Sequence, residues 1–139
     1  MATIALATTK KSPSEKGNSQ SRYQICAGLA ANTSAATTYY TVPGDGVITA
    51  AVVTGSVTSD ATKTYTYVIT NVTASKTVTA ASQVYDADPV LTAGTPASLT
   101  LSTTAADVAV TKGDVISIAF TGGTGSGTTS VIVDVEITA

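Results

Sequence analysis

Residues 37–53 mark the point where this chain changes character. They read Thr37-Thr38-Tyr39-Tyr40-Thr41-Val42-Pro43-Gly44-Asp45-Gly46-Val47-Ile48-Thr49-Ala50-Ala51-Val52-Val53. The first part is rich in β-branched and aromatic residues, residues 43–46 are typical of turns, and the last part is again apolar and β-branched. The stretch therefore predicts a strand, a turn and a second strand at the entrance to an all-β body.

The composition of the whole chain also favours sheet over helix. Its 139 residues suit one domain, and 43% of them are hydrophobic, which is enough to build a core. Charged residues make up 12% of the chain, whereas the exposed faces of helices usually carry many Glu and Lys residues. No run reaches the ~20 apolar residues of a membrane span, and the first charges follow the mild N-terminal apolar run. We therefore expect no membrane segment, no secretory signal and folding in a cytosol.

The sequence predicts an extended N-terminal arm and linker at residues 1–36, ahead of a β-sandwich domain at residues 37–139. Within the arm, residues 23–31 are compatible with either a first strand or an apolar anchor. Residues 8–22 have too few apolar side chains to form a core of their own. The charge divides in the same way, because residues 1–24 carry a net charge of +3 and residues 25–139 carry −5. The residues of the arm that we expect to contact a partner are Lys10, Lys11, Lys16, Arg22, Tyr23 and Ile25.

The arm does not have the pattern of a nucleic-acid ligand. Its four cations are interleaved with no aromatic residue before Tyr23, and an acidic protein surface suits them as well as phosphate does. We expect a protein partner and no nucleic acid. The single cysteine, Cys26, lies in an apolar run and predicts a buried thiol in the core or at an interface.

Short strands follow at the regular spacing of an antiparallel sandwich. Residues 63–72 alternate so that Tyr65, Tyr67 and Ile69 share one face. The last third repeats this pattern, and residues 123–127 between its two strands predict a hairpin loop. The residues expected to face inward there are Ile116, Ile118, Phe120, Val131, Val133, Val135 and Ile137.

The chain has no histidine, which excludes Ser-His-Asp and Cys-His catalysis and removes the commonest zinc ligand. Two acidic pairs remain. Asp86 and Asp88 lie in a turn without EF-hand spacing, and Asp134 and Glu136 share the polar face of a strand. We expect no enzymatic activity, no cofactor and no metal.

Three segments carry a resemblance to a known group of proteins. They are Tyr-Thr-Val-Pro-Gly-Asp-Gly-Val-Ile-Thr at 40–49, Val-Thr-Lys-Gly-Asp-Val-Ile-Ser-Ile at 110–118 and Val-Ile-Val-Asp-Val-Glu-Ile at 131–137. Residues 37–139 thereby resemble small jelly-roll modules of tailed-phage virions, which are head decoration (cement) proteins and head-fibre or tail-fibre modules. The resemblance implies a jelly-roll-like sandwich.

The same resemblance implies a function and a partner. It implies a non-enzymatic homotrimer on the outer capsid surface of a bacteriophage virion that is assembled in the host cytoplasm. The arm would clasp the major capsid protein or neighbouring subunits. The alternative is a receptor- or glycan-binding module of a fibre, with exposed tyrosines as stacking platforms. The candidates for that role are Tyr39, Tyr40, Tyr65, Tyr67 and Tyr85.

Overall fold

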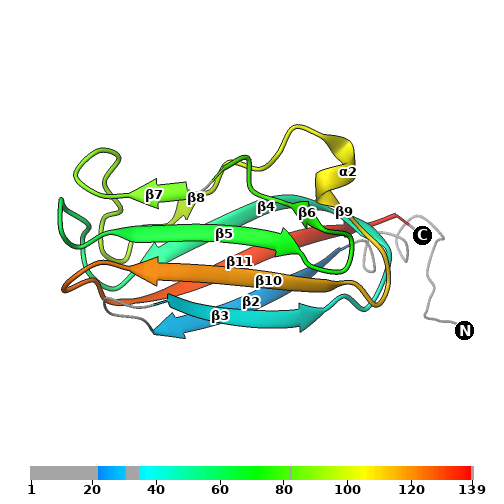
Figure 1. Ribbon diagram of the computed structural model, residues 1–139, viewed down its shortest axis with the longest axis horizontal. Coiled ribbons are helices and arrows are strands. Elements are labelled where there is room, and N and C mark those ends of the chain that lie inside the picture. Colours follow the sequence, from blue (N-terminus) through cyan, green and yellow to red (C-terminus); the bar gives the residue numbers. More distant parts are fainter. Residues whose placement is uncertain (1–21, 31–34, 82, 139) are drawn as a thin grey trace, which may run out of the picture.

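The computed structural model describes residues 22–30, 35–81 and 83–138. These residues form two antiparallel sheets that stack face to face, as Figure 1 shows. One short helix, α2 (Ala105–Val108), accompanies them. The predicted all-β sandwich is confirmed.

Each sheet has five strands. Sheet I has the order β2-β11-β4-β8, and β9 also pairs with β4. Its strands are β2 (Arg22–Ala30), β11 (Thr128–Ile137), β4 (Gly46–Gly55), β8 (Ala97–Ser98) and β9 (Ala109–Val110). Sheet II has the order β3-β10-β5-β6, and β7 also pairs with β5. Its strands are β3 (Ala35–Thr41), β10 (Val115–Gly122), β5 (Tyr65–Asn71), β6 (Lys76–Thr77) and β7 (Gln83–Tyr85).

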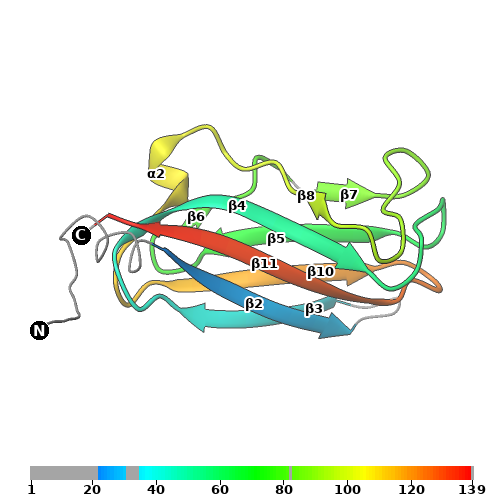
Figure 2. The same ribbon diagram turned by 180° about the vertical axis from the view of Figure 1, so that it is seen from behind.

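The connections between the sheets are those of a jelly roll. The chain passes from one sheet to the other at each step from β2 to β5, and the last two long strands return between earlier ones. Strand β10 lies between β3 and β5, and β11 lies between β2 and β4 (Figures 1 and 2). When β6 with β7 and β8 with β9 each count as one interrupted strand, this is the eight-stranded jelly roll.

Alternation along the long strands builds the core between the sheets. In β5, Tyr65, Tyr67 and Ile69 point inward and are fully buried, as the sequence predicted. The inward residues of β10 and β11 are also buried, although Ile137 at the end of β11 is half-buried. The rings of Tyr65 and Tyr67 stack on Phe120, with centroids 5.6 and 5.4 Å away. These aromatic side chains therefore fill the middle of the sandwich.

The sandwich begins earlier than the sequence predicted. Residues 22–30, expected to belong to the arm, form β2 and pair along their whole length with β11. Ile25, Ala27 and Leu29 alternate inward and are buried, so β2 contributes to the core. The predicted boundary after residue 36 is therefore wrong for this segment, whereas residues 1–21 of the predicted arm lie outside the described residues.

Cys26 also differs from its prediction. It belongs to the opposite parity of β2 from Ile25 and Ala27, so its side chain is exposed on the outer face of sheet I. An apolar neighbourhood in sequence therefore did not place the thiol in the core, because the alternation of the strand decides the side. In the described part of the chain, no helix has the length and apolarity to cross a membrane.

Candidate functional site

The outer face of sheet II is an extended surface without charge. Its three long strands, β3, β10 and β5, contain no Asp, Glu, Lys or Arg at any position. The registers bring their outward residues into rows, such as Tyr39 beside Ser117 and Ser117 beside Thr70. We call this surface the uncharged face. Its residues are Ala35, Thr37, Tyr39, Thr41, Val115, Ser117, Ala119, Thr121, Thr66, Val68 and Thr70.

Strand β3 forms one margin of the uncharged face, and its far side has no partner strand among the described residues. The Val42 N–H donates to the Asp114 carbonyl over 2.8 Å, and Val42 lies opposite Asp114 when the β3–β10 register is continued. Since hydrogen-bonded positions alternate in an antiparallel pair, the even-numbered residues of β3 direct their backbone groups at β10. The odd-numbered residues Ala35, Thr37, Tyr39 and Thr41 direct theirs at the free edge.

The other side of β10 supports this assignment. The Val72 N–H donates to the Val115 carbonyl over 2.8 Å, so odd-numbered residues of β10 bond toward β5. The backbone groups of the even-numbered residues Ile116 and Ile118 therefore point toward β3, which agrees with the assignment made from Val42 and Asp114. The free edge of β3 thus presents four donors and four acceptors at every second residue.

Two adjacent tyrosines distinguish this edge. Tyr39 points outward and is 65% exposed, and Tyr40 points toward the core side yet remains 36% exposed. Inward residues of the central strands are almost completely buried, as Ile118 is at 0%. The core side of sheet II is therefore partly exposed to solvent at the margin formed by β3, whereas it is fully buried at the central strands.

Strand β2 is the corresponding edge of sheet I, and its inner side is better covered. Ile25, Ala27 and Leu29 are all buried. Tyr23 is half-buried, and its hydroxyl donates to the Gly44 carbonyl over 3.2 Å. Burial is the main cause that raises the pKa of Tyr23, and the neighbouring Tyr40 and Asp45 raise it further. On the outer side, the Gln24 amide donates to the Asp134 carboxylate over 2.7 Å.

The predicted partner-binding residues have different positions in the structure. Lys10, Lys11 and Lys16 lie outside the described residues. Arg22 is exposed at the start of β2 and pairs in register with Glu136, so it is available to a partner. Ile25 is 1% exposed, and the prediction that its side chain contacts a partner is wrong because it packs in the core.

The tyrosines proposed as stacking platforms also separate into two groups. Tyr65 and Tyr67 are fully buried and unavailable to a ligand, and Tyr85 is half-buried with its hydroxyl donating to the Ser98 carbonyl over 3.1 Å. Tyr39 and Tyr40 remain at the surface. Both were predicted as candidates from the sequence. Their position on an edge strand was not predicted, because the order of strands in a sheet depends on pairing between distant segments.

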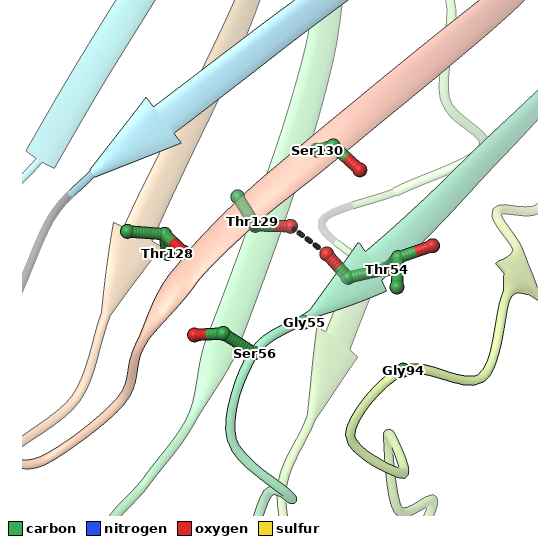
Figure 3. A pocket seen from close by; sticks show the side chains of 7 residues that line it. All are labelled: Thr54, Gly55, Ser56, Gly94, Thr128, Thr129 and Ser130. Atoms are coloured by element: carbon green, nitrogen blue, oxygen red, sulfur yellow. Dashed lines mark hydrogen bonds between the residues drawn. The ribbon is translucent and has the colours of Figure 1, made fainter.

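A shallow pocket lies at the end of sheet I, where β4 ends and β11 begins (Figure 3). It has a volume of about 400 Å³ and is lined by threonine, serine and glycine residues. The Thr129 hydroxyl is already used, because it donates to the Thr54 carbonyl over 2.9 Å. The pocket has neither a charged group nor an aromatic ring to orient a ligand. Its residues are Thr54, Gly55, Ser56, Gly94, Thr128, Thr129 and Ser130.

Several acidic side chains hold local structure together. Asp114 accepts from the Asn71 amide over 2.8 Å and from the Thr111 N–H over 2.9 Å, which fixes the turn before β10. Asp86 accepts from the Asp88 N–H over 2.9 Å within its own turn. Within residues 22–30, 35–81 and 83–138, no three Cys, Asp or Glu side chains gather as a metal site would require.

Comparisons with known proteins give no relative for this chain. No family model matches it, and no curated protein or solved structure matches it either. The most distinctive surfaces of the described residues are the uncharged face and the free edge of β3.

Proposed function

We propose that this chain is a non-enzymatic structural protein of a bacteriophage virion that decorates the outer capsid surface and stabilises the shell. The observation that carries the proposal is a jelly roll whose most distinctive surfaces are an uncharged sheet face and a free strand edge. Such surfaces suit extended contacts with other protein subunits. The resemblance of residues 37–139 to virion modules points the same way.

In this proposal, residues 1–21 hold the sandwich to the major capsid protein. They carry Lys10, Lys11 and Lys16 against Glu15, whereas the residues from Arg22 onward carry eight Asp or Glu side chains and four Lys or Arg side chains. A basic segment ahead of an acidic body can bind an acidic capsid surface without attracting the body to it. Many copies on a shell then multiply a weak individual contact.

A binding assay on purified particles tests the role of the segment. Capsids that lack this protein are mixed with the full chain or with a chain that lacks residues 1–21, and bound protein is measured after sedimentation. The full chain should saturate the particles, and the shortened chain should remain in solution with an unchanged sandwich. Wild-type occupancy by the shortened chain would refute the proposed attachment.

A matched pair of charge variants sharpens the assay. The double variant Lys10→Ala with Lys11→Ala should lose most of the binding, and added salt should weaken the binding of the wild-type protein. The control is Lys76→Ala with Lys112→Ala, because both side chains belong to exposed residues of the sandwich. Equal loss in both variants would mean that net charge, and not the segment, governs binding.

One observation favours a second candidate function. Tyr39 presents a largely exposed ring on the uncharged face, which is the kind of platform on which sugars stack. The chain would then be a receptor- or glycan-binding module of a head or tail fibre. Binding on a glycan array that Tyr39→Ala abolishes and Tyr85→Phe preserves would support this function. A few copies per particle, instead of a number comparable to the capsid subunit, would support it independently.

A further inference from the structure

We infer that the free edge of β3 pairs with the β3 edge of a second copy, antiparallel and centred on Thr38, so that the two sheets II continue into one sheet across a two-fold axis. This contact is separate from the attachment of residues 1–21 to a capsid. Its test can therefore fail while the proposed function stands, and the reverse also holds.

The edge has none of the features that normally prevent such pairing. Proteins guard exposed edges with Lys, Pro, inward charges or bulges. Strand β3 reads Ala-Ala-Thr-Thr-Tyr-Tyr-Thr and contains none of these residues. Its register with β10 runs without a shift from Thr41 to Ala35. The edge is therefore a regular, uncharged template seven residues long.

The positions of the free backbone groups fit a second copy. In an antiparallel pair centred on Thr38, each residue faces the one at the mirrored position, so Thr37 faces Tyr39 and Ala35 faces Thr41. All four of these residues direct their N–H and C=O groups at the free edge. Every free donor then meets a free acceptor, and the four pairs exchange about eight backbone hydrogen bonds.

The side chains fit the same register. On the core side, Tyr40 of one copy would lie beside Ala36 of the other, so a large and a small residue share the open margin. On the outer side, Tyr39 would lie beside Thr37, an aromatic and β-branched pair of the kind that stabilises sheets. The added strand would thus cover Tyr40, which points toward the core side and is now 36% exposed.

Charge favours the uncharged face and its edge as the place where two copies meet. The sandwich carries twice as many acidic as basic side chains from Arg22 onward, so contacts between copies elsewhere bring like charges together. Strand β3 has no charge, and neither does β10 behind it. Pairing at β3 also makes the two uncharged faces continuous.

Strand β2 is a less suitable edge for this contact. Its inward residues are already buried, so an added strand would cover little further apolar surface. It also begins with Arg22, and a charged residue on an edge strand opposes pairing with another strand. We therefore assign the contact to β3. The resulting two-fold pair differs from the homotrimer that the resemblance implies.

The first experiment measures the mass of the full chain in solution by light scattering over a concentration series. The expected mass rises to twice the 13.8 kDa of the chain. Thr37→Pro should remain at the mass of one chain, because proline removes a free N–H without removing a bond to β10. A wild-type monomer, a trimer, or a Thr37→Pro dimer would overturn the inference.

Two controls separate this contact from association through β2 or the N-terminal segment. Gly28→Pro removes a donor from the free edge of β2, where a side chain has open space, and should leave the dimer intact. Removal of residues 1–21 should also leave it intact. Loss of the dimer in the shortened chain would show that the N-terminal segment joins the copies, and would overturn the pairing of β3.

A cross-link tests the register and does not depend on how well the proline variant folds. Thr38 would face Thr38 of the second copy at a non-hydrogen-bonded position, where Cα atoms lie about 4.5 Å apart. That spacing suits a disulfide. In a Cys26→Ser background, Thr38→Cys treated with diamide should give a covalent dimer, as two thiols pass two electrons and two protons to diamide. Thr41→Cys is the matched control and should stay monomeric on a denaturing gel; equal cross-linking of both would overturn the register.

Discussion

The hydroxyl of Tyr67 and the Oγ1 atom of Thr129 lie 2.7 Å apart and connect the two sheets inside the core. Tyr67 belongs to β5 of sheet II and Thr129 to β11 of sheet I. The Thr129 hydroxyl has one proton and donates it to the Thr54 carbonyl over 2.9 Å. The Tyr67 hydroxyl is therefore the donor to Thr129, and a chain of two hydrogen bonds crosses from sheet II into the β4–β11 pair.

This arrangement predicts unequal effects for its two members. Thr129→Val leaves the buried Tyr67 hydroxyl without an acceptor and should lower the free energy of unfolding by about 1–3 kcal/mol. Tyr67→Phe removes the hydroxyl and leaves Thr129 bonded to Thr54, so the loss should be smaller, about 1 kcal/mol. Urea unfolding measures both values. Tyr39→Phe, at an exposed position, is the control, and a larger loss for Tyr67→Phe than for Thr129→Val would contradict the assigned donor.

Alkaline pH should destabilise the fold. Burial raises the pKa of Tyr67 well above the 10.0 of a free tyrosine, and burial also raises the pKa values of Tyr23 and Tyr85. A raised folded-state pKa stabilises the fold fully below the unfolded pKa, and this contribution is lost as the pH rises toward the folded value. The free energy of unfolding should therefore fall above about pH 10.

The Tyr67→Phe variant tests the origin of this pH dependence. Its free energy of unfolding should fall less steeply between about pH 9 and pH 11 than that of the wild-type protein. The two slopes are compared by urea unfolding at a fixed ionic strength. Identical slopes would assign the alkaline destabilisation to other groups.

The sandwich could be predicted from the sequence because alternation of apolar and polar residues is visible within each single strand. Alternation places Tyr65, Tyr67 and Phe120 inside regardless of which strand lies beside them. The sequence left open whether residues 23–31 are a first strand or an apolar anchor, and it placed them ahead of the sandwich domain. Their partner is β11, and Gln24 and Asp134 are 110 positions apart in the chain. Cys26 and Gly28 also weaken the apolar alternation of this segment, so its pattern alone does not decide between a strand and an anchor.

The candidate surface was predictable in part. Charged residues make up only 12% of the chain, and Tyr39 and Tyr40 were identified as candidate contact residues. The free edge of β3 could not be predicted, because the last strands of the chain decide which strands become edges. Which residues of β3 have unpaired N–H groups depends on its register with β10, and the register is known only once these two strands pair.

Close packing around Gly123 predicts a sensitive position in the loop between β10 and β11. A Cβ atom there would clash with the Thr62 carbonyl oxygen and would lie 2.8 Å from the Thr64 nitrogen. Gly123→Ala should therefore lower the free energy of unfolding by about 1–3 kcal/mol, since backbone atoms must move. Gly28→Ala, with no atom within 4 Å, is the matched control and should leave stability unchanged or slightly raised. Equal thermal unfolding of the two variants would refute the clash.

The Tyr65 hydroxyl predicts a link between two loops at the same end of the sandwich. It donates to the Val57 carbonyl over 2.7 Å and accepts from the N–H groups of Val57 and Gly127, each over 3.1 Å. Tyr65→Phe leaves these three backbone groups without that partner and should cost roughly 2–3 kcal/mol. Amide hydrogen exchange should accelerate at Val57 and Gly127 and stay unchanged at the centre of β10, because the loops open before the core does. Uniform acceleration throughout the protein would mean that the hydroxyl supports global stability and does not specifically join the two loops.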